Sequence, residues 1–361
     1  MSSIAATTTP ATPVGKVRLG IFTWESLSVG GLSTILLILA WLLTERRQDY
    51  YWPTQVAFIL AFLVNFPHFF ASYALLYQDH RDLIFKRARY FWAGVLAPGI
   101  MVGIFYFIWR GLRAELLPPV IISMFFLVGW HYIKQTFGCF VVCSARRGFY
   151  LAKIERQMLL IQLHAIWMLS FTRHLSRPGV QVFYGVTYTP PTLPKYLVHV
   201  SAIVLAISSA AFVGLLFRRF IKAREWPPFP ALIAVIAMHT WYIPVFHFDV
   251  FSAFIPLFHS LQYLYFVGLY KESQTRGMAD DPRLLYLTAF FLGTMAVGAL
   301  GFYYLPNFID KHFGTPNPWT GPTLALALFN LFINIHHYFI DNAIWRADNE
   351  LVSKHLFNNR A

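Results

Sequence analysis

The stretch YLVHVSAIVLAISSAAFVGLLF, residues 196–217, decides the fold class of this chain. It runs for 22 residues without an Asp, Glu, Lys or Arg. A helix rises 1.5 Å per residue, so about 20 apolar residues cross the hydrocarbon core of a bilayer. We therefore interpret residues 196–217 as a transmembrane helix.

The same length criterion identifies nine further apolar stretches, so the sequence predicts an all-α fold, a polytopic transmembrane helical bundle with about ten spans. Of the 361 residues, 57% are hydrophobic and only 12% are charged, whereas about 25% are charged in a soluble domain. We expect a disordered cytoplasmic tail at 1–20, a single transmembrane helical domain at 21–346 and a second cytoplasmic tail at 347–361. The expected spans are 27–44, 52–77, 91–109, 117–142, 156–172, 196–217, 229–248, 252–270, 284–305 and 321–345.

The formal net charge of +13 reflects how the chain is oriented in the membrane. If the N-terminus is cytoplasmic, most Lys and Arg residues fall in the inner connections and few in the outer ones, which is the positive-inside bias. The bias predicts a multi-pass protein of the cell inner (cytoplasmic) membrane with both termini cytoplasmic. It indicates membrane lipid as a partner and gives no support to nucleic acid.

Four of the expected spans carry histidines in short polar motifs. A polar group in hydrocarbon costs free energy unless it is paired, so such residues are functional candidates. The four spans run in the same direction. His68, His131 and His336 fall at similar depth, and His259 lies somewhat shallower. We therefore predict that they converge on one metal site. The motifs are Asn65-Phe66-Pro67-His68, Trp130-His131-Tyr132, Phe258-His259-Ser260, and Asn334-Ile335-His336-His337.

Each motif also carries polar companions that could orient the imidazoles. A ligating histidine needs an acceptor for its second ring N–H. Lys134 is either a counter-charge beside His131 or a side chain that snorkels toward the inner face. The companions expected to support the histidines are Asn65, Gln135, Gln262, Asn334 and Asp341.

Neutral imidazoles with open coordination positions suit ferrous iron, copper or zinc. Redox-active iron with open positions activates dioxygen. The alternative is a set of interhelical hydrogen bonds without any metal, because polar side chains also join transmembrane helices.

These motifs resemble those of the bacterial Brp/Blh family, the integral-membrane β-carotene 15,15′-dioxygenases that make retinal. The resemblance runs from about residue 55 to residue 346, through short motifs only. It rests on Pro67-His68, Trp130-His131, Phe258-His259-Ser260 before Phe266-Val267, and His336-His337-Tyr338-Phe339-Ile340-Asp341 before Arg346.

The resemblance implies iron ligands at His68, His131 and His259. At the family's fourth ligand position this chain has Tyr263. Either Tyr263 contributes a phenolate or a hydrogen bond, or His336 or His337 completes the site, or three histidines suffice. The Gly and Asp that follow the first histidine in the family are replaced here by the sequence Phe69-Phe70-Ala71-Ser72.

The leading hypothesis is a non-haem Fe2+ oxygenase that acts with dioxygen on a lipophilic substrate entering from the bilayer. The substrate would be a carotenoid or another isoprenoid or lipid, and Tyr263 and Lys134 are the candidate catalytic side chains beside the metal. One alternative is a haem- or copper-binding redox protein, and another is a histidine-lined transporter or proton relay. The need for an electron donor stays open.

Overall fold

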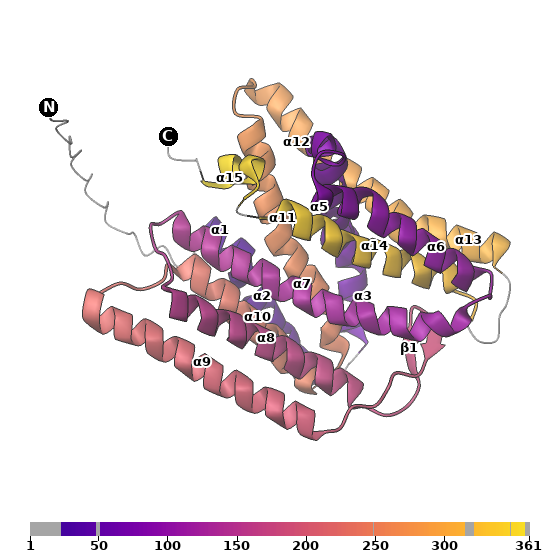
Figure 1. Ribbon diagram of the computed structural model, residues 1–361, viewed down its shortest axis with the longest axis horizontal. Coiled ribbons are helices and arrows are strands. Elements are labelled where there is room, and N and C mark those ends of the chain that lie inside the picture. The colour runs from indigo at the N-terminus through magenta and orange to yellow at the C-terminus, as the bar shows by residue number, and fades with distance from the viewer. Residues whose placement is uncertain (1–22, 48–50, 248, 315–320, 347, 358–361) are drawn as a thin grey trace, which may run out of the picture.

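The computed structural model describes residues 23–47, 51–247, 249–314, 321–346 and 348–357 (Figure 1). Nearly all of them are helical, which confirms the all-α prediction. The only strands in this part of the chain are β1 (Gln181–Phe183) and β2 (Val186–Tyr188), which pair as a short antiparallel hairpin.

Several long helices contain short π-helical or 3-10 segments. One continuous helical segment, called a rod below, therefore often comprises two or three elements. In chain order they are α1 (Trp24–Ser26), η1 (Leu27–Gly31), α2 (Leu32–Arg47), α3 (Trp52–Leu60), η2 (Ala61–Asn65), α4 (Phe66–Ala74), η3 (Leu75–Asp79), η4 (Arg81–Leu83), α5 (Ala88–Phe91), η5 (Trp92–Leu96), α6 (Ala97–Trp109), η6 (Ala114–Leu116), α7 (Leu117–Ala145), α8 (Lys153–Leu175), α9 (Tyr196–Ala223), α10 (Phe229–His247), η7 (Asp249–Ala253), α11 (Phe254–Gln274), α12 (Asp280–Ala299), η8 (Leu300–Tyr304), α13 (Leu305–Phe313), α14 (Leu324–Ile344) and α15 (Glu350–Phe357).

Eight helical rods in the described residues are long and apolar enough to cross a membrane. The helical bundle is therefore that of a membrane protein. The eight are Trp24–Glu45, Trp52–Asp79, Ala88–Trp109, Ala114–Ala145, Tyr196–Ala223, Val250–Gln274, Asp280–Phe313 and Leu324–Ile344.

The expected count of about ten spans is not supported. The expected span 156–172 lies within α8, which carries Glu155 and Arg156 near its start and Gln162 and His164 along its length. These polar side chains keep α8 out of the set of sufficiently apolar helices. The expected span 229–248 corresponds to α10, of which only the shorter apolar stretch Phe229–Tyr242 could be considered.

Burial separates the inner helices from the outer ones. In α14 and in the rod that ends with α11, 72% and 61% of the most apolar window is buried within the protein. The corresponding shares are 17% in α9 and 11% in the rod that begins with α12. α9 lies along one edge of the bundle, and α14 lies close to α6 and α7 (Figure 1). The histidine motifs of α11 and α14 are therefore in the interior.

The expected N-terminal tail, 1–20, lies outside the described residues. Part of the expected C-terminal tail, 347–361, forms α15, which packs on α11 through the buried side chains of Val352 and Leu356. The Asn349 side chain donates a hydrogen bond to the Ile344 carbonyl 2.8 Å away. The segment directly after α14 is therefore held against the bundle.

Gly129 allows α7 to pack closely against α8. A Cβ atom at position 129 would lie 2.0 Å from Cδ1 of Trp167, whose indole is buried. Gly129→Ala is expected to destabilise the protein by about 1–3 kcal/mol, because the indole cannot move without disturbing the core. Thermal unfolding of the detergent-purified protein measures the effect.

Gly138→Ala is the matched control, since it lies in the same helix and its Cβ would meet nothing within 4 Å. Alanine has the higher helix propensity, so this variant should be at least as stable as the wild type. Equal melting temperatures for the two variants would contradict the packing argument.

Candidate metal centre

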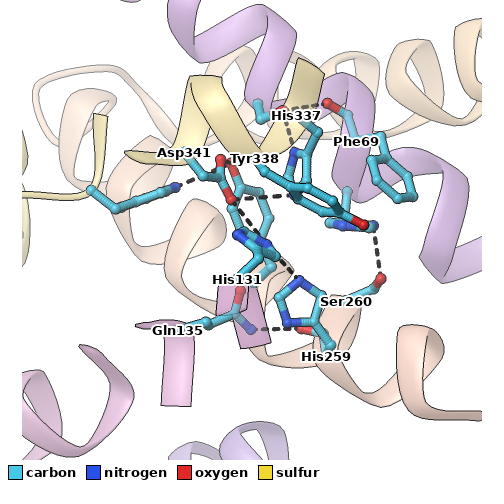
Figure 2. Close-up of polar contacts among 12 residues, drawn as sticks. Phe69, His131, Gln135, His259, Ser260, His337, Tyr338 and Asp341 are labelled. Carbon is cyan, nitrogen blue, oxygen red and sulfur yellow. Dashed lines mark hydrogen bonds and ion pairs between the residues drawn. The ribbon is translucent and has the colours of Figure 1, made fainter. Parts of the chain in front are cut away.

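Four helices bring four imidazoles and one carboxylate together in the interior. His68 comes from α4, His131 from α7 and His259 from α11, while His337 and Asp341 come from α14. Potential ligand atoms of His68, His259 and His337 lie within 4.8 Å of one another, and so do those of His131, His337 and Asp341. All five side chains are buried. Figure 2 shows the imidazoles of His131, His259 and His337 near the Asp341 carboxylate.

The spacing of these atoms suits a single metal ion. Nε2 of His131 lies 3.0 Å from Nε2 of His259. Asp341 Oδ2 lies 3.6 Å from Nε2 of His131 and 3.3 Å from Nε2 of His337. A first-row metal binds imidazole at about 2.0–2.1 Å, which places neighbouring ligand nitrogens about 3 Å apart.

The His68 imidazole is oriented from the start of α4. Pro67 lacks an N–H and follows the π-helical segment η2, which ends at Asn65. His68 Nδ1 contacts the Asn65 carbonyl and lies 2.7 Å from the Ser260 hydroxyl. The single Ser260 proton has acceptors in the Pro256 carbonyl and in Asn65 Oδ1, so His68 Nδ1 is the donor. The lone pair of His68 is then on Nε2.

The His337 imidazole is oriented by the same arrangement. Its Nδ1 atom lies 2.8 Å from the hydroxyl of Ser72, and that hydroxyl donates to the Phe69 carbonyl at 2.6 Å. A serine hydroxyl has one proton, so Nδ1–H of His337 must donate to Ser72. The lone pair of His337 is on Nε2, next to Asp341.

Two of these imidazoles have a buried Nε2 atom without a hydrogen-bond partner, those of His68 and His337. In His259 the atom without a partner is Nδ1, whereas Nε2 faces His131. Leaving a buried polar atom unpaired costs about 1–3 kcal/mol. The two unpaired Nε2 atoms are compensated if they are ligands. The residues present therefore fit a bound metal ion.

Asp341 gives a second indication. Its ion-pair contacts are with His131 and His337, and it accepts a hydrogen bond from the Tyr263 hydroxyl at 2.9 Å. Trp345 Nε1 in turn donates to the Tyr263 oxygen at 3.2 Å. A buried carboxylate needs a compensating positive charge, and a metal cation beside two neutral imidazoles would supply it.

His336, the other histidine of the last motif, faces away from the cluster. Its Nε2 atom lies 2.7 Å from the Ala93 carbonyl, which can only accept, so Nε2 carries the proton. Its Nδ1 atom then accepts from the Tyr73 hydroxyl at 2.8 Å. Both ring nitrogens are engaged, and none is left for a metal.

The other predicted side chains take different positions. Gln135 donates to the His259 carbonyl and to Gln262 Oε1, so these two glutamines support α11. Asn334 accepts from the Tyr338 hydroxyl and does not contact the histidine that follows it by three. Lys134 is exposed and lies over the ring of Trp130, away from the cluster.

Sequence reasoning gave no role to several side chains that enclose the cluster. Ser72 and Ser260 orient two imidazoles, the Tyr338 ring stacks on His131 at 4.8 Å, and the Phe69 ring lies 3.9 Å from that of His68. Ser72 follows His68 by four residues, so helical periodicity alone could have placed it on the same face. The aromatic rings surround the imidazoles with apolar surface.

No family model, curated protein or solved structure matches this chain.

Proposed function

We propose that this chain is an integral-membrane non-haem iron oxygenase that acts with dioxygen on a lipophilic substrate, a carotenoid or another isoprenoid or lipid. The supporting observation is the buried cluster of four imidazoles and Asp341, in which Nε2 of His68 and Nε2 of His337 lack a hydrogen-bond partner. His131, His337 and Asp341 form a set of two histidines and one carboxylate, the donor set of non-haem Fe2+ oxygenases with open positions. The motif resemblance to the Brp/Blh dioxygenases points to the same chemistry.

Ferrous iron would supply the electrons that activate dioxygen. The side chains of the protein hold the imidazoles in position and exclude water from them. Ser72 and Ser260 keep Nδ1 of two imidazoles protonated, and the Tyr263 hydroxyl keeps its proton against Asp341 Oδ1. The rings of Phe69 and Tyr338 exclude water from the imidazoles.

The distribution of Lys and Arg supports a multi-pass location in the cell inner membrane with both termini cytoplasmic. A haem is less well supported, because its macrocycle would have to fit between imidazoles that already contact one another. The facing nitrogens of His131 and His259 are 3.0 Å apart. The remaining alternatives are a copper-binding redox protein and a metal-free, histidine-lined transporter or proton relay, in which Asp341 and Tyr263 would take part.

Metal analysis of the detergent-purified protein, with its visible spectrum, tests the proposal. We expect about one iron ion per chain and no haem absorption band. Incubation with β-carotene or with an isoprenoid alcohol under oxygen-18 gas should then place the isotope in an oxidised product. A protein that stays free of iron after supplementation would contradict the proposal and favour the relay, and copper in its place would favour the copper alternative.

A further inference from the structure

A groove of about 490 Å³ runs along the surface between α4–η3 and α12. Its lining is mostly aromatic and apolar and includes Phe70, Tyr73, Tyr77, Tyr286 and Phe290. Both walls belong to rods that are apolar enough to cross a membrane. The volume is within the range of about 300–1,000 Å³ that is common for small-molecule sites.

We propose that this groove is the port through which the substrate enters the candidate metal centre from the bilayer. The occupant is a single-chain isoprenoid-like lipophile with one polar end group. This inference rests on the proposed function and adds to it a route, an orientation and a substrate class.

The apolar end of the groove lies next to a series of packed aromatic rings that reaches the metal centre. Phe70 lines the groove, and its ring lies 6.3 Å from that of Phe302. The Phe302 ring lies 4.8 Å from Phe69, and Phe69 lies 3.9 Å from His68 and 4.8 Å from His337. A short series of aromatic rings is therefore all that separates a chain in the groove from the imidazoles.

Tyr73 makes a second connection. It lines the groove, and its hydroxyl lies 2.8 Å from Nδ1 of His336, the residue next to His337. The wall of the groove is thus hydrogen-bonded to the helix that supplies two of the clustered side chains.

The opposite end of the groove is polar. Gln78 and Tyr286 line it there, and the Tyr286 hydroxyl lies 3.3 Å from Nζ of the buried Lys271. Lys271 is paired with Asp79, at the end of the rod that contains α4. A hydroxyl or carbonyl end group finds hydrogen-bonding partners at this end, so the hydrocarbon chain points toward Phe70.

A second, larger groove is not lined by the helices that carry the clustered side chains. It measures about 740 Å³ and lies between α8 and α9, with Met158, His164 and Val204 in its lining. None of the five clustered side chains comes from α8 or α9. The port is therefore selected by the series of aromatic rings that connects the groove beside α4 to the imidazoles, and not by its size.

Phe70 closes the inner end. Its ring packs against Gly301, where an added Cβ would lie 2.8 Å from Phe70 Cζ. Gly301 belongs to η8, and a single π-helical turn inside a longer helix often marks a functional segment. A chain that passes from the groove to the imidazoles must displace the Phe70 ring first, and then pass the rings of Phe302 and Phe69.

Gly293→Trp tests the groove. Gly293 lines it, and a Cβ there would meet nothing within 4 Å, so the indole can enter the groove without backbone strain. Gly214→Trp is the matched control, an exposed glycine on α9 with equally open surroundings. The probe is an isoprenoid alcohol that carries a photoactivatable diazirine and an alkyne tag. Labelled peptides are mapped by mass spectrometry, and iron is measured in the same preparations.

We expect wild-type labelling on peptides of α4–η3 and α12. Gly293→Trp should reduce it by about tenfold, because the indole fills the site, and Gly214→Trp should not. Excess unlabelled isoprenoid alcohol should compete, whereas excess phospholipid should not. Unchanged labelling in Gly293→Trp, or equal competition by phospholipid, would show an ordinary lipid contact and overturn the port.

Phe70→Ala provides an independent arm if Gly293→Trp does not fold. Removing the ring should extend labelling to peptides that contain Phe302 or His337, and labelling confined to the groove would overturn the inner route. Iron content separates the two proposals. Groove labelling in a protein that never holds iron would overturn the proposed function and the role of the groove as a port, while iron with unaffected labelling would overturn the port alone.

Discussion

His337→Ala is expected to abolish metal binding, whereas His336→Ala, one residue away, should leave it intact. His337 belongs to both groups of candidate ligands, and its Nε2 atom has no hydrogen-bond partner. His336 uses both ring nitrogens for Ala93 and Tyr73. Removal of a ligand that the two groups share should lower bound iron to the background level.

The comparison is well controlled because both substitutions remove the same side chain from the same helix, and both imidazoles are buried. Metal content after purification and the melting temperature should be measured for both variants. Loss of iron in His337→Ala alone, at similar melting temperatures, supports the assignment. Loss of iron in both variants, or in neither, would contradict it.

The sequence predicted four of the five clustered residues as a set because the physical signal is strong. Histidines are costly in hydrocarbon, and those of α4, α7, α11 and α14 recur on spans that run in one direction. Adjacent residues on a helix point about 100° apart, so His336 and His337 could not both face one site. Asp341, four residues after His337, already indicated which one shares its face.

The orientation of side chains toward neighbouring helices was harder to predict. Lys134 follows His131 by three residues, but its long side chain reaches the surface and lies over Trp130. Asn334 precedes His337 by three residues, yet its amide donates to the Asn330 carbonyl and accepts from Tyr338. Such local bonds compete with contacts to the site and depend on packing that the sequence pattern does not contain.

Tyr263 occupies the position of the fourth ligand in the Brp/Blh family. The sequence left open three ways in which the site could be completed. In the structure the Tyr263 hydroxyl donates to Asp341, and His337 is the additional imidazole beside His68, His131 and His259. This arrangement favours the explanation in which a histidine of the last motif completes the site. The spacing of the motifs along the sequence could not decide between the three explanations. The positions of α14 and α11 relative to each other depend on the tertiary packing of the bundle.

The second large effect is expected at the buried ion pair between Lys271 of α11 and Asp79 at the end of η3. Nζ of Lys271 lies 2.7 Å from Asp79 Oδ2, and the lysine is completely buried, 4.8 Å from the Phe290 ring. Asp79→Asn should destabilise the protein by about 3–5 kcal/mol, because it leaves a buried ammonium without its counter-charge. Thermal unfolding in detergent measures the change.

Lys271→Met should cost less than Asp79→Asn, because the Asp79 side chain is 13% exposed and Gln274 lies 3.4 Å from it. The double variant should be more stable than Asp79→Asn alone, since an apolar side chain then fills the place of the unpaired ammonium. Additive losses in the double variant would mean that the two charges act independently. Recovery would instead show that the two charges are coupled across the contact between α11 and the rod that contains α4.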